Sequence, residues 1–347
     1  MAANQGAERP HRPDGLGAPG WADVHLVHRS LPELALSEID LRTEVAGLTL
    51  PYPVMINAMT GGAHAVAAIN RNLAILAADL RVPMAVGSQT AAIREPEVED
   101  SFRVVRREHP TGVIVANVGA ASSVDDAGRA VAMLEANALQ VHLNAPQELV
   151  MPEGDRDFRG QIGRIAQMVT TVSVPVIVKE CGFGISRETA RQLYDVGVRA
   201  IDISGRGGTN FAWIEAQRGG GAIDPGLEDW GIPTAAAVAE VAALGLPGLQ
   251  LIASGGIRYG SEAAKALALG AAAAGVAGPV LQALQAGGID AARQYVTTLL
   301  GDLARTMLLC GAPSVAAMQR RPVVVTGPTG EWCRLRGVDL SRLANRQ

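Results

Sequence analysis

The chain contains few aromatic residues, few cysteines and almost no lysine. Only 3% of its 347 residues are aromatic, whereas 48% are hydrophobic, so Ala, Val, Leu and Ile supply most of the apolar content. This composition suits the core of a parallel α/β protein. The cysteines, Cys181, Cys310 and Cys333, have no metal-ligand spacing and do not indicate a disulfide framework.

Long apolar runs are also lacking. No stretch is long enough to span a membrane, and the first fifteen residues lack the apolar centre of a signal peptide, so we expect a cytoplasmic protein with no membrane partner. The net charge is −4 with both signs mixed along the chain, which gives no sign of a nucleic-acid surface. Residues 1–20 are rich in proline, glycine and charge and predict a loosely docked arm.

A strand–turn–helix rhythm repeats eight times and predicts a (β/α)8 TIM barrel over residues 46–301. An N-terminal arm and lead-in segment, residues 1–45, precede it, and a C-terminal helical extension, residues 302–347, packs on its exterior. An open doubly wound sheet would need a Gly-x-Gly-x-x-Gly turn after the first strand, which Met59-Thr60-Gly61-Gly62 does not provide. The predicted strands cover residues 54–58, 83–86, 113–117, 139–142, 174–178, 200–203, 251–253 and 271–276.

The last two predicted strands end in glycine-rich turns, Ser254-Gly255-Gly256 and Ala277-Gly278-Pro279. Ser261 is the expected N-cap of the helix between them, and Gly270 its end. Two such turns at neighbouring strand ends favour a phosphate site, because bare backbone N–H groups can point at one anion. Two ordinary βα turns are the alternative.

Polar residues follow the other predicted strands, where a barrel builds its active site. The set is mostly uncharged, which suits a heteroaromatic ring such as that of flavin mononucleotide (FMN), with its phosphate at the glycine turns. Lys179 is one of only two lysines among 30 basic residues and could stabilise a reduced, anionic ring; a structural salt bridge is the alternative. The strand-end residues are Thr60, Ser88, Asn117, His142, Asn144, Gln147, Glu148, Lys179, Ser204, Thr209 and Ser254.

The segment from His142 to Glu148 is a second candidate cluster. Alternation puts His142 and Asn144 on one side of an extended segment, and the following proline turns Gln147 and Glu148 towards them. One carboxylate is a poor metal site by itself but is adequate for Mg²⁺ that also binds substrate phosphates. Taken singly, His142 could equally be a core histidine and Glu148 a solvated loop charge.

A third candidate is the loop and helix start from Ser204 to Glu215. Its glycines let the backbone approach a bound ring, and the Ser204 and Thr209 hydroxyls can donate to it. Trp213 could form the wall of an apolar pocket or simply pack in the core.

Six motifs, in this order, resemble the type II isopentenyl diphosphate isomerase family: MINAMTGG, VGSQ, VHLNAPQE, VIVKE, DISGRGGTNFAWIEAQR and ASGGIR. The resemblance runs from about Ala22 to the C-terminus. It implies an FMN-dependent barrel that interconverts isopentenyl and dimethylallyl diphosphate with Mg²⁺, its flavin reduced by NADPH. It also implies a homo-oligomer, a tetramer or an octamer.

The resemblance assigns roles by position. Gln147, His142 and Asn144 would be catalytic, Glu148 would bind the metal, and the substrate would contact Ser88, Gln89, Gln147 and Trp213. FMN would be held by Ala58, Met59, Thr60, Ser88, Asn117, Lys179, Ser204, Thr209, Gly255, Gly256, Ile257, Arg258, Ala277 and Gly278.

One motif of the family, Arg-Lys-x-x-His near the N-terminus, grips the substrate diphosphate and has no match in residues 1–22. Arg9-Pro10-His11-Arg12 has the charges but not the order. Either a basic arm lies upstream of the given start, or the protein is a divergent homologue that acts on another prenyl or phosphorylated substrate or binds flavin without turnover.

Two other barrel chemistries fit less well. An FMN-dependent 2-hydroxy acid oxidase needs a histidine base and an arginine at a strand end, and a nucleotide dehydrogenase needs a catalytic cysteine after strand six. The turn from Ser204 to Thr209 has neither the histidine nor the cysteine.

Overall fold

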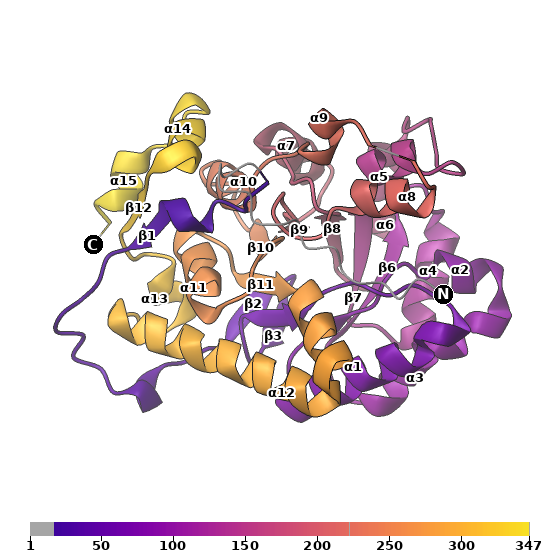
Figure 1. Cartoon of the computed structure of the whole chain (residues 1–347), viewed down its shortest axis with the longest axis horizontal. Helices are drawn as coiled ribbons and strands as arrows, with labels where there is room; N and C mark the ends of the chain where they lie inside the picture. The colour runs from indigo at the N-terminus through magenta and orange to yellow at the C-terminus, as the bar shows by residue number, and fades with distance from the viewer. Residues whose placement is uncertain (1–16, 222, 347) are drawn as a thin grey trace.

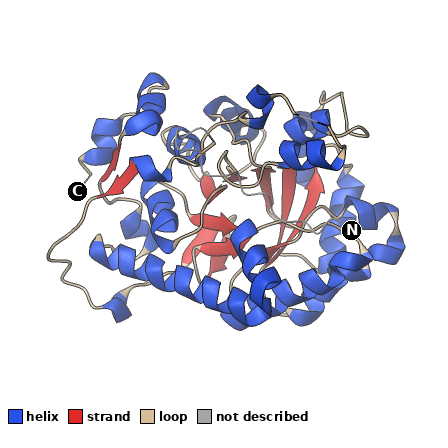
Figure 2. Cartoon of the chain, viewed as in Figure 1, coloured by secondary structure: helices blue, strands red, loops and turns tan. Residues whose placement is uncertain are grey.

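Eight short strands close into a parallel barrel at the centre of the molecule (Figures 1 and 2). The computed structural model describes residues 17–221 and 223–346. Around the barrel the strands follow the order β10-β11-β4-β5-β6-β7-β8-β9, so the predicted TIM barrel is confirmed. Their bounds are β4 (Val54–Ile56), β5 (Met84–Ala85), β6 (Ile114–Gly119), β7 (Ala138–Leu143), β8 (Val176–Glu180), β9 (Ala200–Asp202), β10 (Gln250–Ser254) and β11 (Ala273–Val276).

Amphipathic helices cover the outside of the barrel. Serine side chains start two of them, as Ser123 accepts from the Asp126 amide and Ser186 from the Thr189 amide. The outer helices are α1 (Ala67–Leu80), α3 (Asp100–Glu108), α4 (Val124–Leu134), α6 (Gln161–Thr171), α7 (Arg187–Asp195), α10 (Thr234–Ala242), α11 (Gly260–Leu269) and α12 (Gly278–Leu309). Short helices lie in the loops: α2 (Thr90–Arg94), α5 (Ala145–Val150), α8 (Phe211–Arg218) and α9 (Pro225–Glu228), with 3₁₀ turns at Trp21–Asp23, Leu36–Glu38, His64–Val66 and Pro96–Val98.

The prediction that Ser261 caps α11 is wrong. The helix begins at Gly260, two residues earlier than expected, so Ser261 lies inside its first turn. Glu262 instead satisfies the free amides there, since its Oε2 accepts from the backbone N–H groups of Arg258 and Tyr259 at 2.7 and 3.2 Å. The predicted end at Gly270 is confirmed, with a left-handed φ of 117°.

A β-hairpin closes the N-terminal end of the barrel. Strands β2 (Thr43–Val45) and β3 (Leu48–Leu50) turn at Ala46 and Gly47, both with positive φ. Val45 and Leu50 pack against the apolar side chains that fill the barrel beneath the site. The sequence analysis expected only the end of the lead-in segment and the approach to the first barrel strand here.

Both ends of the described chain meet on one side of the barrel (Figure 1). Strand β1 (Val24–Leu26) pairs antiparallel with β12 (Val323–Val325), and α13 (Val315–Met318), α14 (Gly327–Leu335) and α15 (Leu340–Ala344) complete the extension. Helix α12 continues to Leu309, so the predicted boundary at residue 301 falls within a helix.

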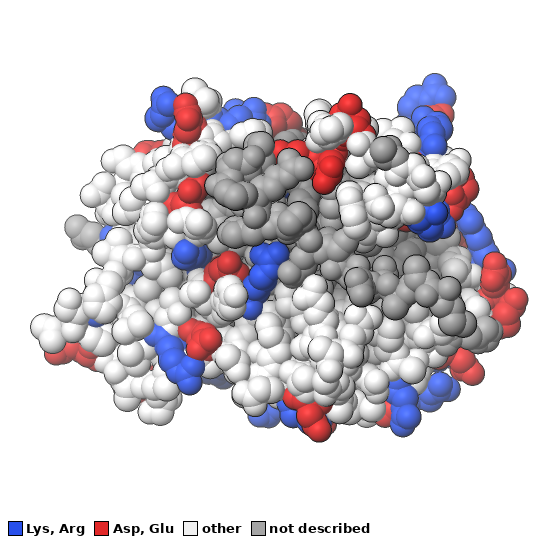
Figure 3. Space-filling model, viewed as in Figure 1, with Lys and Arg blue, Asp and Glu red and all other residues white. Residues whose placement is uncertain are grey.

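The described part of the face drawn in Figure 3 is mostly uncharged. Figure 3 shows basic and acidic side chains interspersed on the face that it draws. Among the described residues, no helix combines the length and apolarity needed to cross a bilayer.

Candidate active site

The two glycine turns meet at one cavity at the C-terminal ends of the strands. Ser254, Gly255 and Gly256 line it from β10, and Ala277 and Gly278 line it from β11 and the start of α12. The long α12 therefore directs its N-terminus, with its free N–H groups, at this first cavity.

Glycine is required where the turn after β10 packs against the loop that follows β9. Gly255 has φ +99°, and a Cβ there would lie 2.2 Å from the carbonyl oxygen of Gly205. Gly278 differs, since a Cβ there would meet nothing within 4 Å. The turns thus leave an open anion cradle next to a tightly packed backbone.

Lys179 lines the first cavity from the end of β8. Its side chain is 8% exposed, its Nζ donates to the carbonyl oxygen of Glu180 at 2.7 Å, and Asp202 Oδ2 lies 3.8 Å from it. Lys179 therefore lines the cavity and also forms a salt bridge, although the sequence analysis set out a site position and a salt bridge as alternatives. Of the other residues predicted to bind FMN, this cavity is also lined by Ala58, Met59, Ser204, Thr209, Ile257 and Arg258.

A second cavity adjoins the first, and both are lined by Ala58, Met59, Lys179, Cys181 and Phe211. The structure brings together in it most of the predicted catalytic, substrate and metal residues, namely Ser88, His142, Asn144, Gln147 and Glu148, together with Asn117, which was predicted to bind FMN. Both predicted clusters thus open on one continuous site.

Hydrogen bonds fix the corner formed by Asn144, Gln147 and Glu148. Asn144 Nδ2 donates to Glu148 Oε1 at 2.7 Å, and the amide of Asp155 donates to Glu148 Oε2 at 2.9 Å. Gln147 Nε2 donates to Glu215 Oε1 at 3.1 Å, so this glutamine presents its amide nitrogen to a carboxylate on α8. Pro146 lies in the first turn of α5, a helix that the sequence did not predict.

His142 is neutral at physiological pH. Burial, followed by the positive charge of Lys179, lowers the pKa of the imidazole to about 4, against a hydrogen bond with the Val118 backbone. Its Nδ1 lies 2.8 Å from Asn117 Oδ1. Burial also raises the pKa of the Cys181 thiol to about 12, which keeps it protonated. Neither group supplies a strong acid or an anionic nucleophile.

The charges around the second cavity are mainly acidic. Arg94 and Lys179 face a larger set of carboxylates there, namely Asp126, Glu148, Glu153 and Asp155. Within the described part of the chain, no group of three or more histidine, cysteine or acidic residues could hold a metal ion. A single carboxylate such as that of Glu148 could hold Mg²⁺ only if water and phosphate supplied the remaining ligands.

Three predicted site residues do not line either cavity. Gln89 is fully buried, where Nε2 donates to the Ala130 carbonyl at 3.0 Å and Oε1 accepts from the Asn117 amide at 2.9 Å. Thr60 donates through its hydroxyl to Asn70 Oδ1 at 2.5 Å. Trp213 lies on a face of α8 that does not line the first cavity, whereas Phe211 and Ile214 of the same helix do.

The sequence analysis missed a polar layer inside the barrel and several lining residues. Asn57, Gln140 and Asp202 are buried within otherwise apolar strand patterns, so period-two alternation hides them. Arg94 and Phe211 lie on short loop helices. Arg94 follows the second predicted strand and Phe211 the sixth, and this closeness to a strand end was the signal that could have identified them.

Comparisons with known proteins find similar sequences over most of the chain. Residues 143–325 match the family model described as FMN-dependent dehydrogenase. The chain is 65% identical over 346 residues to an isopentenyl-diphosphate delta-isomerase of Symbiobacterium thermophilum, covering 99% of this chain and 95% of that protein. It is 51% identical over 319 residues to the enzyme of the same name from Moorella thermoacetica, covering 92% of each.

Solved structures of mandelate oxidase share the fold. One with a monooxide FMN adduct has a TM-score of 0.66 at 20% identity and covers 90% of this chain and 91% of that one. At this identity the likeness extends to the barrel alone.

Proposed function

The chain belongs to the family of FMN-dependent isopentenyl-diphosphate delta-isomerases, and from this membership we propose how its strand-end residues carry out the reaction. The enzyme converts isopentenyl diphosphate to dimethylallyl diphosphate by moving a carbon–carbon double bond. The shift needs one proton added at one carbon and another removed from a second carbon. Reduced FMN, when bound, supplies the acid and base for this transfer.

We propose that FMN lies in the first cavity. The observation that carries this proposal is that both glycine turns, the N-terminus of α12 and Lys179 line the same cavity. The backbone N–H groups of Gly255, Gly256 and Gly278 would bind the phosphate. The Lys179 ammonium would stabilise negative charge on the ring, and the Ser204 and Thr209 hydroxyls would hydrogen-bond to its polar edge.

The prenyl diphosphate belongs, in this proposal, to the second cavity. Its negative charge would be repelled by Glu148, Glu153 and Asp155 unless a cation intervened. We therefore infer that Glu148 holds Mg²⁺, which would neutralise the diphosphate. Arg94 adds a second positive group on the cavity wall.

The remaining polar groups orient the substrate through hydrogen bonds rather than through ionic interactions. Glu215 holds the Gln147 amide in one orientation, so that Gln147 can direct the reacting end of the prenyl chain. Neutral His142 acts as a hydrogen-bonding wall beside it, together with Asn144.

The substitution Glu148→Gln tests the metal assignment. Pre-reduced protein with isopentenyl diphosphate should lose Mg²⁺-dependent turnover by at least about 100-fold, because a neutral amide is a poor Mg²⁺ ligand. The bound flavin should keep its absorbance. Glu97→Gln, at an exposed position, is the control and should keep wild-type turnover. Mg²⁺-dependent activity in the E148Q variant would exclude Glu148 as the metal ligand.

Three further features rest on the resemblance alone: NADPH as the reductant of the flavin, a homo-oligomer of four or eight chains, and a cytoplasmic location. The N-terminal diphosphate-binding motif of the family has no match in residues 1–22, and residues 1–16 of that stretch lie outside the described residues.

A further inference from the structure

Polar side chains from five barrel strands or their ends form one hydrogen-bonded layer across the barrel, at the floor of the two cavities, which Asn57, Ser254 and Asn117 also line. Asn117 Nδ2 donates to Gln140 Oε1, and Gln140 Nε2 donates to Asn57 Oδ1, each at 3.1 Å. Asn57 Nδ2 then donates to Asp202 Oδ2 at 2.6 Å, and the Ser254 hydroxyl donates to Asp202 Oδ1 at 2.5 Å. The layer therefore converges on one carboxylate.

Asp202 is fully buried and lines neither cavity. Each of its oxygens accepts a hydrogen bond from a neutral donor, and the cation beside it is Lys179, with Nζ 3.8 Å from Oδ2. A buried carboxylate is costly without such a partner. Lys179 lines both cavities, so the pair presents its positive end to the site and keeps its negative end in the layer.

The position of Lys179 does not depend on Asp202 alone. Its Nζ also donates to the Glu180 carbonyl oxygen at 2.7 Å, a bond that survives when the charge of Asp202 is removed. A ring in the first cavity would thus meet one end of a neutral ion pair rather than an isolated ammonium group.

We propose that Asp202 is a positioning residue that offsets the charge of Lys179 and thereby sets the reduction potential of the bound flavin. Reduction adds negative charge to the ring, so an uncompensated Lys179 would favour the reduced form more strongly than the native pair does. This inference rests on the proposed seating of FMN in the first cavity.

The test is the reduction potential of bound FMN, measured anaerobically against a reference dye. Asp202→Asn keeps an amide that can accept from Asn57 but removes the charge. It should raise the potential by at least about 30 mV, which is a tenfold change in the ratio of the dissociation constants of reduced and oxidised FMN for a two-electron couple. Lys179→Gln should lower the potential by a similar amount.

The double variant K179Q/D202N removes both charges, so neither residue leaves a buried charge without a partner. It therefore provides the test if the single Asp202 variant does not fold. Its potential should lie between those of the two single variants. Asp302→Asn, at an aspartate on α12 whose side chain is 43% exposed and paired with Arg305, is the control for a change of one charge that lines neither cavity, and it should leave the potential within a few millivolts of wild type.

Two results would overturn the inference in different ways. An unchanged potential in D202N, or a shift in the same direction as in K179Q, would mean that Asp202 does not offset Lys179. If K179Q itself leaves the potential unchanged, FMN does not sit beside Lys179, and the proposed seating fails together with this inference.

Discussion

At the scale of single residues, burial shifts two neighbouring side chains in opposite directions. It raises the pKa of Glu180 to about 8, although hydrogen bonds from the Phe183 and Gly184 amides and the charge of Lys179 oppose the shift. It lowers the pKa of His142 to about 4. Both groups are therefore neutral in the folded protein near pH 7, and Lys179 carries the positive charge beside them.

These shifts predict how stability depends on pH. Between about pH 4.5 and 6.5, Glu180 holds a proton in the folded protein that it releases in the unfolded chain, so it makes the free energy of unfolding fall as the pH rises. Over the same range His142 binds a proton only in the unfolded chain, so it makes the free energy of unfolding rise. These two contributions cancel. From about 6.5 to 8 only Glu180 contributes, and the free energy of unfolding should fall by about 1.4 kcal/mol per pH unit.

Glu180→Gln should remove this fall above pH 6.5 and expose, below it, the rise due to His142 and to His109, whose pKa burial also lowers. Urea unfolding across the pH range measures both slopes. The exposed substitution Glu331→Gln serves as the control and should keep the wild-type profile. A wild-type slope in E180Q would show that Glu180 is not protonated in the folded state.

At the scale of elements, the N-terminus of α12 is the part of the cradle that tolerates a side chain, because Gly278 has open space around an added Cβ. Gly278→Asp should preserve the fold, since a carboxylate in the first turn complements the helix dipole. It should nevertheless weaken FMN binding by at least about tenfold, because it repels the phosphate at the same N–H groups.

Gly163→Asp is the matched control. Gly163 lies in the first turn of α6, also with nothing within 4 Å of an added Cβ, and lines neither cavity. Fluorescence titration of the apoprotein with FMN should show wild-type affinity for G163D. Equal affinity in both variants would place the phosphate away from α12.

The elements that could be predicted from the sequence are those with local signals. Each barrel strand is an apolar run stopped by glycine or a polar residue, and the glycine turns after β10 and β11 lie where they were expected. The hairpin of β2 and β3 and the pairing of β1 with β12 were not predicted. Short strands of three residues carry little pattern, and β1 and β12 pair across nearly 300 positions of sequence.

The same reasoning explains the errors at the site. A polar residue after a strand can point into the cavity, as His142 does, or into the shell of helices, as Gln89 does, and the sequence does not distinguish the two directions. The scarcity of lysine likewise did not distinguish a lysine at the site from one with a structural role. Lys179 lines the site, whereas Lys265 donates to the Trp21 carbonyl oxygen and ties the lead-in segment to α11.

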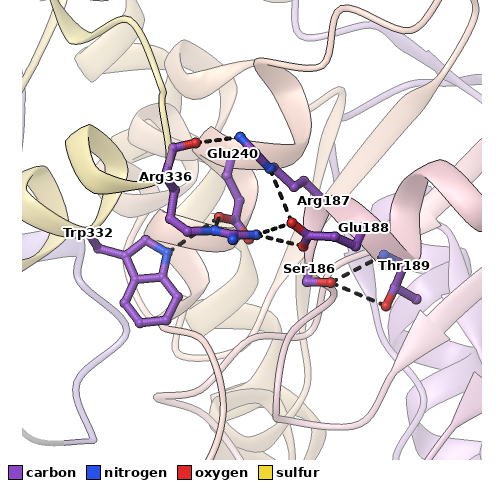
Figure 4. A network of polar contacts seen from close by, with 7 residues as sticks. All are labelled: Ser186, Arg187, Glu188, Thr189, Glu240, Trp332 and Arg336. Atoms are coloured by element: carbon purple, nitrogen blue, oxygen red, sulfur yellow. Dashed lines mark hydrogen bonds and ion pairs between the residues drawn. The ribbon is translucent and has the colours of Figure 1, made fainter.

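At the scale of the whole molecule, charge fixes the C-terminal segment to helices around the barrel, in addition to the pairing of β12 with β1. Figure 4 shows Arg336, just after α14, reaching between Glu240 of α10 and Glu188 of α7. Its Nε donates to Glu240 Oε2 at 3.0 Å, and its Nη2 lies 2.6 Å from both oxygens of Glu188. The Glu240 side chain is completely buried, so Arg336 is the counter-charge on which this junction depends.

Arg336→Ala should therefore destabilise the protein by about 3–5 kcal/mol, because it leaves the Glu240 carboxylate buried and unpaired. Arg334→Ala, which removes an exposed ion pair with Glu331 from the same helix, should cost less than about 1 kcal/mol. Chemical denaturation of the three proteins measures the difference. Adding Glu240→Gln to R336A should recover part of the loss, since a neutral amide needs no counter-charge. If the double variant is no more stable than R336A, the loss comes from packing of the arginine stem, and the junction is held by apolar contact rather than by charge.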